Sequence, residues 1–255
     1  MALINTAKPA TTLANAAKAI GYESWDTVTT TWATETRNWQ QASSNLSNSY
    51  RIEYRVYDVA AIAFAPVTLT GAATSITLAD DAVSAGITLP FSFRLFVDFF
   101  TTVFISSNGY IGFSPIGMTR YNTSSIPGGV SPSGQIYGYW CDLDPSAGGT
   151  IKYETLGTAG SRMFVVQYQN VPLFEVPTDT STFQIILFEA DYHVEVQTTV
   201  GKITSTFTKA GQGIESLDGT TAYYLAGRNN AHFNLINDGV SLRYTKNILN
   251  INKPT

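Results

Sequence analysis

Most of the chain is a succession of short segments in which apolar and polar residues alternate, separated by turn signals. Between residues 50 and 57, for example, Ile52, Tyr54 and Val56 alternate with charged side chains. A period of two places the apolar side chains on one face of a β-strand. Pairs such as Asn108-Gly109 and Asp218-Gly219 are typical of the turns between strands. We therefore expect an all-β fold, an antiparallel β-sandwich that is jelly-roll-like.

The expected strands lie within one domain, residues 44–245, which begins in a polar hinge at residues 43–49. An extended arm, residues 1–43, precedes this domain, and a short tail, residues 246–255, follows it. Only residues 12–19 favour a helix. The strands are expected at residues 50–57, 75–78, 91–97, 102–106, 110–113, 136–140, 150–154, 163–169, 182–189, 193–198, 204–208, 222–226, 232–235 and 241–245.

The composition excludes several classes of partner. Charged residues make up 13% of the chain, and the net charge is -4. Lysine and arginine are scattered, so there is no basic face for nucleic acid or for anionic lipid. No segment reaches the ~20 apolar residues of a membrane-spanning helix, so membrane insertion is not expected. The residues after Met1 also lack the pattern of a signal peptide.

Catalytic patterns are weak in this sequence. The chain has one cysteine, Cys141, whose apolar neighbours predict a buried and inert thiol. Glu189, Asp191 and His193 could perform acid–base chemistry, although polar residues also alternate at an ordinary turn between strands. An enzyme would require Asp142 to converge with Glu189 and His193 in one cleft. We do not expect an enzyme.

Cofactors and small ligands leave only faint signals. Asp142 and Asp144 alternate at the end of a strand and could offer oxygen ligands to calcium. The sequence lacks the acidic loop of a complete calcium site, and Asp before Pro also starts a turn, so no cofactor is expected. A glycan is the other candidate ligand, because exposed tyrosines can stack on sugar rings. The candidate tyrosines are Tyr121, Tyr137, Tyr139, Tyr223 and Tyr224.

Four consecutive blocks of sequence carry a resemblance to a known family. The blocks are Phe104-Ile-Ser-Ser-Asn-Gly-Tyr-Ile-Gly-Phe113, Ile136-Tyr-Gly-Tyr-Trp-Cys-Asp-Leu-Asp144, the segment 162–172 and the segment 182–189. Their order and spacing are similar to those of the nidogen-like (NIDO-type) extracellular β-sandwich modules and their relatives in secreted bacterial and archaeal proteins. The similarity covers about residues 91–245 and implies a non-catalytic module used in adhesion or as a structural unit.

The N-terminal arm has an unusual composition. Trp25, Trp32 and Trp39 are seven residues apart, and six of the ten residues from 27 to 36 are threonine. Threonine favours strands, so we expect two short strands with the tryptophans as anchors. A spacing of seven also fits one face of a helix, and an amphipathic helix packed on the domain is the alternative. Lys8-Pro9 in the arm is echoed by Lys253-Pro254 in the tail.

The arm resembles the arms of predicted phage virion proteins from tails or capsids. We therefore expect a non-enzymatic assembly protein on a virion surface. The assembly residues are expected to be Trp25, Trp32, Trp39, Lys8, Pro9, Lys253 and Pro254. The expected partners are copies of the chain, other virion or surface proteins and a host-surface glycan. The alternative is a bacterial or archaeal cell-surface adhesin or filament subunit.

Overall fold

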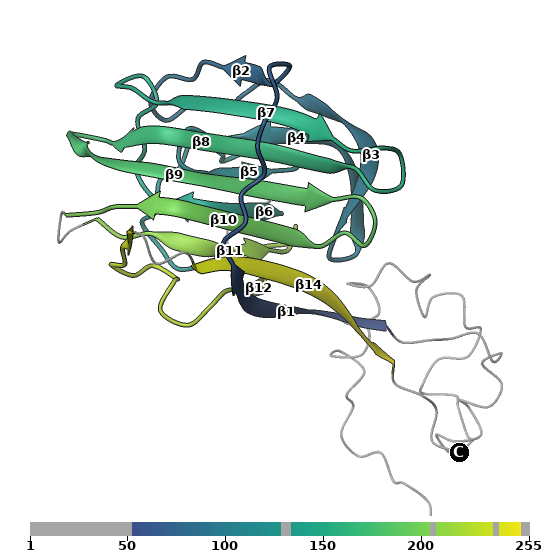
Figure 1. Ribbon diagram of the computed structural model, residues 1–255. Coiled ribbons are helices and arrows are strands. Elements are labelled where there is room, and N and C mark those ends of the chain that lie inside the picture. The colour runs from purple at the N-terminus through teal and green to yellow at the C-terminus, as the bar shows by residue number, and fades with distance from the viewer. Residues whose placement is uncertain (1–52, 129–133, 205–207, 237–239, 251–255) are drawn as a thin grey trace, which may run out of the picture. The chain divides into compact units, whose positions relative to one another are not determined.

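The computed structural model describes residues 53–128, 134–204, 208–236 and 240–250. These residues form two β-sheets, and no helix occurs among them (Figure 1). The predicted all-β sandwich is confirmed. Contacts divide the chain into one unit of Tyr57–Lys246 and another of Met1–Val56 with Asn247–Thr255. The packing described below belongs to the first unit.

The larger sheet has eight strands and is built around an antiparallel meander, β7 to β10. The strand order is β1-β14-β10-β9-β8-β7-β2, and β13 also pairs with β10. The first and last described strands are neighbours in this sheet, since β14 lies between β1 and β10. The strands are β1 (Glu53–Ala63), β2 (Thr74–Ile76), β7 (Thr150–Leu156), β8 (Met163–Leu173), β9 (Val176–Phe188), β10 (Val194–Gly201), β13 (Leu235–Ile236) and β14 (Val240–Asn250).

The smaller sheet has six strands in the order β12-β11-β6-β5-β4-β3. Here a meander of β3 to β6 is extended by β11 and β12, which the chain adds after completing β10. The strands are β3 (Ile87–Leu95), β4 (Asp98–Ile105), β5 (Tyr110–Gly112), β6 (Gln135–Trp140), β11 (Gly211–Glu215) and β12 (Ala222–Tyr223).

The two sheets approach each other closely at glycine positions. A Cβ atom on Gly138 of β6 would lie 2.4 Å from a ring carbon of Phe183 and 2.9 Å from Ile185, both on β9. On the other sheet, a Cβ atom on Gly201 of β10 would lie 2.5 Å from the Tyr139 ring. Distances below 3.0 Å require neighbouring atoms to move. The glycines therefore allow buried aromatic rings to fill the space between the sheets.

A loop covers the outer face of the smaller sheet with apolar side chains. Met118 and Ile126 from this loop pack with Tyr110, Tyr137 and Trp140 in a second buried cluster. The indole Nε1 of Trp140 donates a hydrogen bond to the loop, at a distance of 3.1 Å. This cover explains why every residue of β6 and β11 is buried instead of every second one.

The larger sheet has a different cover. Residues 64–73, called the strap below, connect β1 to β2. Because these two strands are at opposite ends of the sheet order, the strap must cross the sheet. Figure 1 shows this segment running across β10, β9, β8 and β7. Most strap residues are exposed, so the strap is not an extension of the apolar core.

Several strand predictions near the C-terminus are wrong. Thr204 and Thr208, the described ends of the predicted strand 204–208, are not in a strand, while 205–207 lie outside the described residues. The predicted strands 222–226 and 232–235 are reduced to the two-residue strands β12 and β13. The prediction also misses β11, in which Gly211 and Gly213 hide the alternation. Both glycines lie close to Ile126 of the covering loop, which leaves little room for side chains.

Gly138 provides a test of the close contact between the sheets. Gly138→Ala should lower the free energy of unfolding by about 1–3 kcal/mol, because the new methyl group would overlap the Phe183 ring. Urea unfolding followed by tryptophan fluorescence measures this change. Gly71→Ala is the matched control, since a Cβ atom there meets nothing within 4 Å. Equal stability of the two variants would contradict the proposed close packing.

Candidate functional site

A row of glutamine side chains crosses the outer face of the larger sheet. Gln197 of β10 lies opposite Gln184 of β9, and Gln184 lies opposite Gln167 of β8. Lys152 of β7 continues the row opposite Gln167. Because directly opposite residues of neighbouring strands share a face, the sheet register itself aligns these four side chains. Gln184 Nε2 also donates a hydrogen bond of 2.8 Å to Gln167 Oε1.

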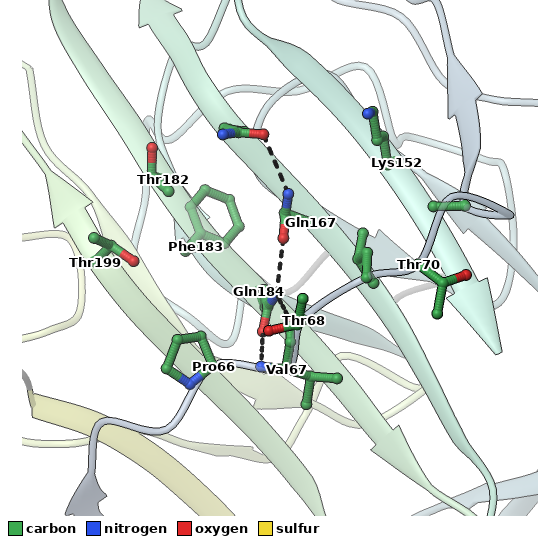
Figure 2. Close-up of a pocket in the computed structure, with 13 residues that line it drawn as sticks. Pro66, Val67, Thr68, Thr70, Lys152, Gln167, Thr182, Phe183, Gln184 and Thr199 are labelled. Carbon is green, nitrogen blue, oxygen red and sulfur yellow. Dashed lines mark hydrogen bonds between the residues drawn. The ribbon is translucent and has the colours of Figure 1, made fainter. Parts of the chain in front are cut away.

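The glutamines hold the strap through its backbone. Gln184 Oε1 accepts from Val67 N at 2.8 Å, and Gln184 Nε2 donates to Val67 O at 2.6 Å (Figure 2). Gln197 Oε1 accepts from Ala65 N at 2.9 Å. The side-chain amides thus bind the strap much as the edge of another strand would. This explains how an exposed segment keeps a fixed path without an apolar face.

The far end of the strap is fixed by a carboxylate. Thr70 N donates a hydrogen bond of 2.7 Å to Glu154 Oε2, and the Thr70 hydroxyl contacts the other carboxylate oxygen. At the near end, Gln197 Nε2 donates to Glu195 Oε2 at 2.8 Å, and Arg243 pairs with Glu195 at 2.6 Å. Burial disfavours ionisation of Glu195, but His193, whose Nε2 lies 3.6 Å away, and the hydrogen bonds from Arg243 and Gln197 outweigh it and lower its pKa to about 2.

A pocket of about 430 Å³ lies between the strap and the sheet. Figure 2 shows Thr182 and Thr199 on one side of Gln184 and Lys152 on the other. Polar and apolar surface contribute about equally to the wall, and Lys152 is its one charged side chain among the described residues. Its lining consists of Pro66, Val67, Thr68, Leu69, Thr70, Ala73, Lys152, Gln167, Gln169, Thr182, Phe183, Gln184 and Thr199.

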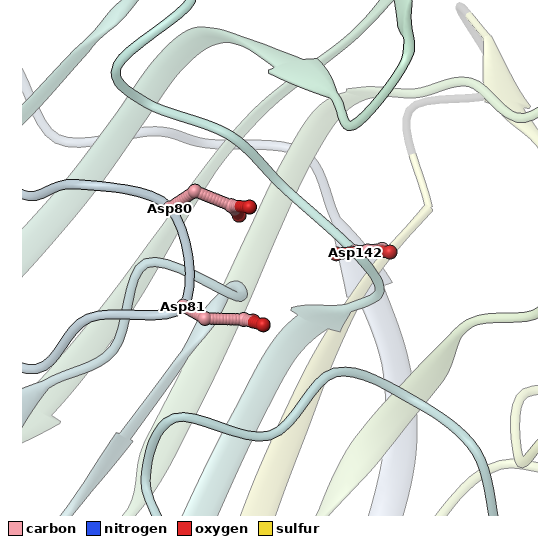
Figure 3. Close-up of side chains that lie close together, drawn as sticks. All are labelled: Asp80, Asp81 and Asp142. Carbon is pink, nitrogen blue, oxygen red and sulfur yellow. The ribbon is translucent and has the colours of Figure 1, made fainter.

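A second candidate site is a group of carboxylates, Asp80, Asp81 and Asp142 (Figure 3). Each offers an oxygen atom, and these atoms lie within 4.8 Å of one another. Asn108 joins the two loops that carry them: its Nδ2 donates to Asp81 Oδ1 at 2.7 Å, and its Oδ1 accepts from Leu143 N at 2.9 Å. The turn containing Asn108 therefore positions the group.

The crowding of these carboxylates changes their ionisation. Burial, then the charges of Asp81 and Asp80, raise the pKa of Asp142 to about 6. Burial, then the charge of Asp81, also raises the pKa of Asp80. Three such oxygens could hold one hard cation such as calcium, although a full calcium shell has about six to eight oxygens. Asp144, predicted as a partner of Asp142, instead accepts a hydrogen bond of 2.9 Å from Ser146 N in its own turn.

The residues considered for acid–base chemistry do not converge. Glu189 pairs with Arg162, with distances of 2.6 and 2.8 Å, and this pairing lowers the pKa of Glu189 to about 2. Arg162, the partner of Glu189, lies just before the first residue of β8. At the other end of β8, Phe174 follows the last residue, and its backbone N donates a hydrogen bond to Asp142 O. His193 Nδ1 lies 2.5 Å from Asp191 Oδ1. Asp142 and Glu189 therefore lie at opposite ends of an 11-residue strand.

Other predicted residues divide between core and surface. Tyr137 and Tyr139 are buried in the core, so the prediction that they could stack on a sugar is wrong. Tyr121 and Tyr224 are exposed, and Tyr223 packs against Tyr57. The buried, free state predicted for Cys141 is confirmed, and burial raises the pKa of its thiol.

The predicted assembly residues lie outside the described residues. They are Trp25, Trp32, Trp39, Lys8, Pro9, Lys253 and Pro254. Conversely, the glutamine row was not predicted from the sequence. The sequence did offer one indication of the row, because Gln167, Gln184 and Gln197 each lie within a predicted strand. The alignment of the row, however, depends on a register that alternation alone does not give.

The sandwich corresponds to a known family. A model described as NIDO related matches residues 53–248. No curated protein matches the chain. No solved structure matches it either. Among the described residues, no helix has the length and apolar character needed to span a membrane.

The strap offers a direct test of the glutamine row. Gln184→Leu should lower the free energy of unfolding by about 1–3 kcal/mol, because the Val67 backbone groups lose their partner. Proteolysis should then cleave the strap faster. Gln169→Leu is the control, since its side chain is exposed and accepts one long bond of 3.3 Å. A strap equally resistant in both variants would contradict this role.

The acidic group predicts a pH dependence. Asp142 has a pKa of about 6 in the folded protein against an ordinary 3.8, so stability should fall as pH rises from about 4 to 6. Asp142→Asn should therefore raise the free energy of unfolding at pH 7 by about 1–2 kcal/mol, after allowance for solvent screening, and the melting temperature should rise with it. The increase should be much smaller at pH 4.

Glu189→Gln is the contrasting control for this experiment. The pKa of Glu189 is lowered, so its contribution is present above pH 4.5 and is lost as pH falls towards 2. This variant should be less stable than the parent at pH 7. Calorimetry over this pH range compares the two variants. The interpretation of the acidic group fails if Asp142→Asn destabilises the protein at pH 7.

Proposed function

The chain belongs to the NIDO-related family. From this membership, together with the resemblance of its arm to virion arms, we propose that it is a non-enzymatic assembly protein on the surface of a phage virion. A NIDO-related domain indicates an extracellular module and is compatible with a structural or adhesive role. In this proposal the sandwich is displayed, and the arm and tail tie it to copies of itself or to the particle.

The family match is the observation that carries the structural or adhesive part of the proposal. It spans residues 53–248, which include all the described strands up to the last residues of β14. The match therefore concerns the whole sandwich and not a single motif within it. Fold membership does not fix a function by itself. The proposal thus also depends on the chemistry of the described side chains and on the composition of the arm.

The polar chemistry of the sandwich supports a non-enzymatic role. Glu189 is paired with Arg162, Glu195 with Arg243, and Asp179 with Lys202 at 3.0 Å. These pairs join neighbouring strands or fix loops, as structural ion pairs do. Cys141, whose thiol is buried, is not placed to act as a nucleophile.

The arm supplies the connection in this proposal. Tryptophan is a preferred anchor residue in protein interfaces, and threonine-rich strands can add to the open edge of a neighbouring sheet. Trp25, Trp32 and Trp39 combine both features in the segment before the sandwich. The resemblance to virion arms favours a phage particle. A cell-surface adhesin or filament subunit is the second candidate, favoured by the same family membership.

Replacement of the three tryptophans tests the connection. The triple variant Trp25→Ala, Trp32→Ala and Trp39→Ala should keep the sandwich folded but lose assembly, because the anchors are gone. Light scattering measures the mass, and circular dichroism reports the fold. The matched control replaces three exposed apolar residues of the sandwich, Phe99, Ile116 and Tyr121, by Ala and should still assemble. An unfolded triple variant would place the tryptophans in the core and reject their role as anchors.

A further inference from the structure

We propose that the pocket beneath the strap binds a neutral saccharide, one or two sugar units of a surface glycan. This inference depends on the adhesive role in the proposed function and names its ligand class. The pocket volume of about 430 Å³ falls within the range of about 300–1,000 Å³ seen for small-molecule sites. Its position on the outer face of the larger sheet makes it accessible beside the exposed strap.

The lining matches the chemistry of a sugar. Its polar groups are mainly amides and hydroxyls, which both donate and accept hydrogen bonds, as sugar hydroxyls do, and apolar surface makes up about the other half. Lys152 is the only charged side chain among the described residues that line the pocket. A single cation provides little for a phosphate-rich ligand, which needs several positive charges or backbone donors. A neutral polyhydroxyl ligand is the better match.

Some lining groups are available to a ligand. In the part of the chain that the structure describes, neither the Thr199 hydroxyl nor the Lys152 ammonium group has a hydrogen-bond partner. Among the described residues, the Gln169 side chain is bonded only through its oxygen, which accepts a hydrogen bond from Gln167. These three residues lie around the pocket on β7, β8 and β10. Because β8 and β9 separate β7 from β10, Lys152 and Thr199 lie about 14 Å apart across the sheet and would contact opposite ends of the pocket's ligand.

Other lining groups are fixed before any ligand arrives. Gln184 is buried and makes three hydrogen bonds, two to Val67 and one to Gln167. It therefore acts as a positioning residue that sets the height of the strap above the sheet. Pro66 and Leu69 of the strap add apolar surface, against which the C–H groups of a sugar can pack. A wall held in this way loses little conformational entropy on binding.

The experiment titrates the full chain with methyl glycosides of glucose, galactose, mannose and N-acetylglucosamine, followed by saturation-transfer NMR. At least one should bind with a dissociation constant of about 1 mM. Thr199→Val or Lys152→Met, according to the end of the pocket that the sugar occupies, should weaken it about 3- to 10-fold, the effect of one lost hydrogen bond. Matched controls are Thr245→Val and Lys209→Met, both exposed and outside the pocket lining, which should leave binding unchanged.

Each outcome decides the question. Binding to none of the four glycosides at about 10 mM overturns the proposal, as does binding that Thr199→Val and Lys152→Met leave unchanged. Assembly is measured separately on the same samples by light scattering. Loss of sugar binding with intact assembly rejects only the saccharide site. Sugar binding by a chain that never assembles would retain the site and reject the assembly role.

Discussion

The close packing of the two sheets is the constraint on which the rest of the structure depends. Gly138 and Gly201 admit the rings of Phe183 and Tyr139, so that aromatic side chains fill the interior. Each such side chain contributes roughly 1.5–3 kcal/mol when it is fully buried. Because the inner faces are occupied in this way, all remaining chemistry must lie on the two outer faces or in the loops.

The two outer faces are covered by opposite means. Apolar residues of a loop, including Met118 and Ile126, cover the smaller sheet and bury both faces of its central strands. The larger sheet is crossed by a polar strap, which Gln184 and Gln197 hold through its backbone. The first cover extends the core, whereas the second leaves amide and hydroxyl groups beside solvent. This difference is why the larger sheet, and not the smaller one, carries the proposed binding surface.

Sequence patterns predict the fold better than the site. Alternation in segments such as 50–57 predicts strands and hence a sandwich, because such a strand buries one face. It does not reveal β11, where Gly211 and Gly213 lack side chains to show the pattern. Of the acidic group, the sequence analysis identified Asp142 but not Asp80 and Asp81, which come from a loop some sixty residues earlier in the chain. Tyr137 and Tyr139 were misplaced because both faces of β6 are buried, one by the covering loop.

The proposal under test is that a NIDO-related sandwich is displayed by an arm that connects it to copies of itself. The most direct measurement is the solution mass of the full chain and of a chain beginning at residue 44, by size-exclusion chromatography with light scattering. We expect the full chain to assemble and the shortened chain to be a folded monomer. Two monomers, or two assemblies of the same order, would contradict the proposal.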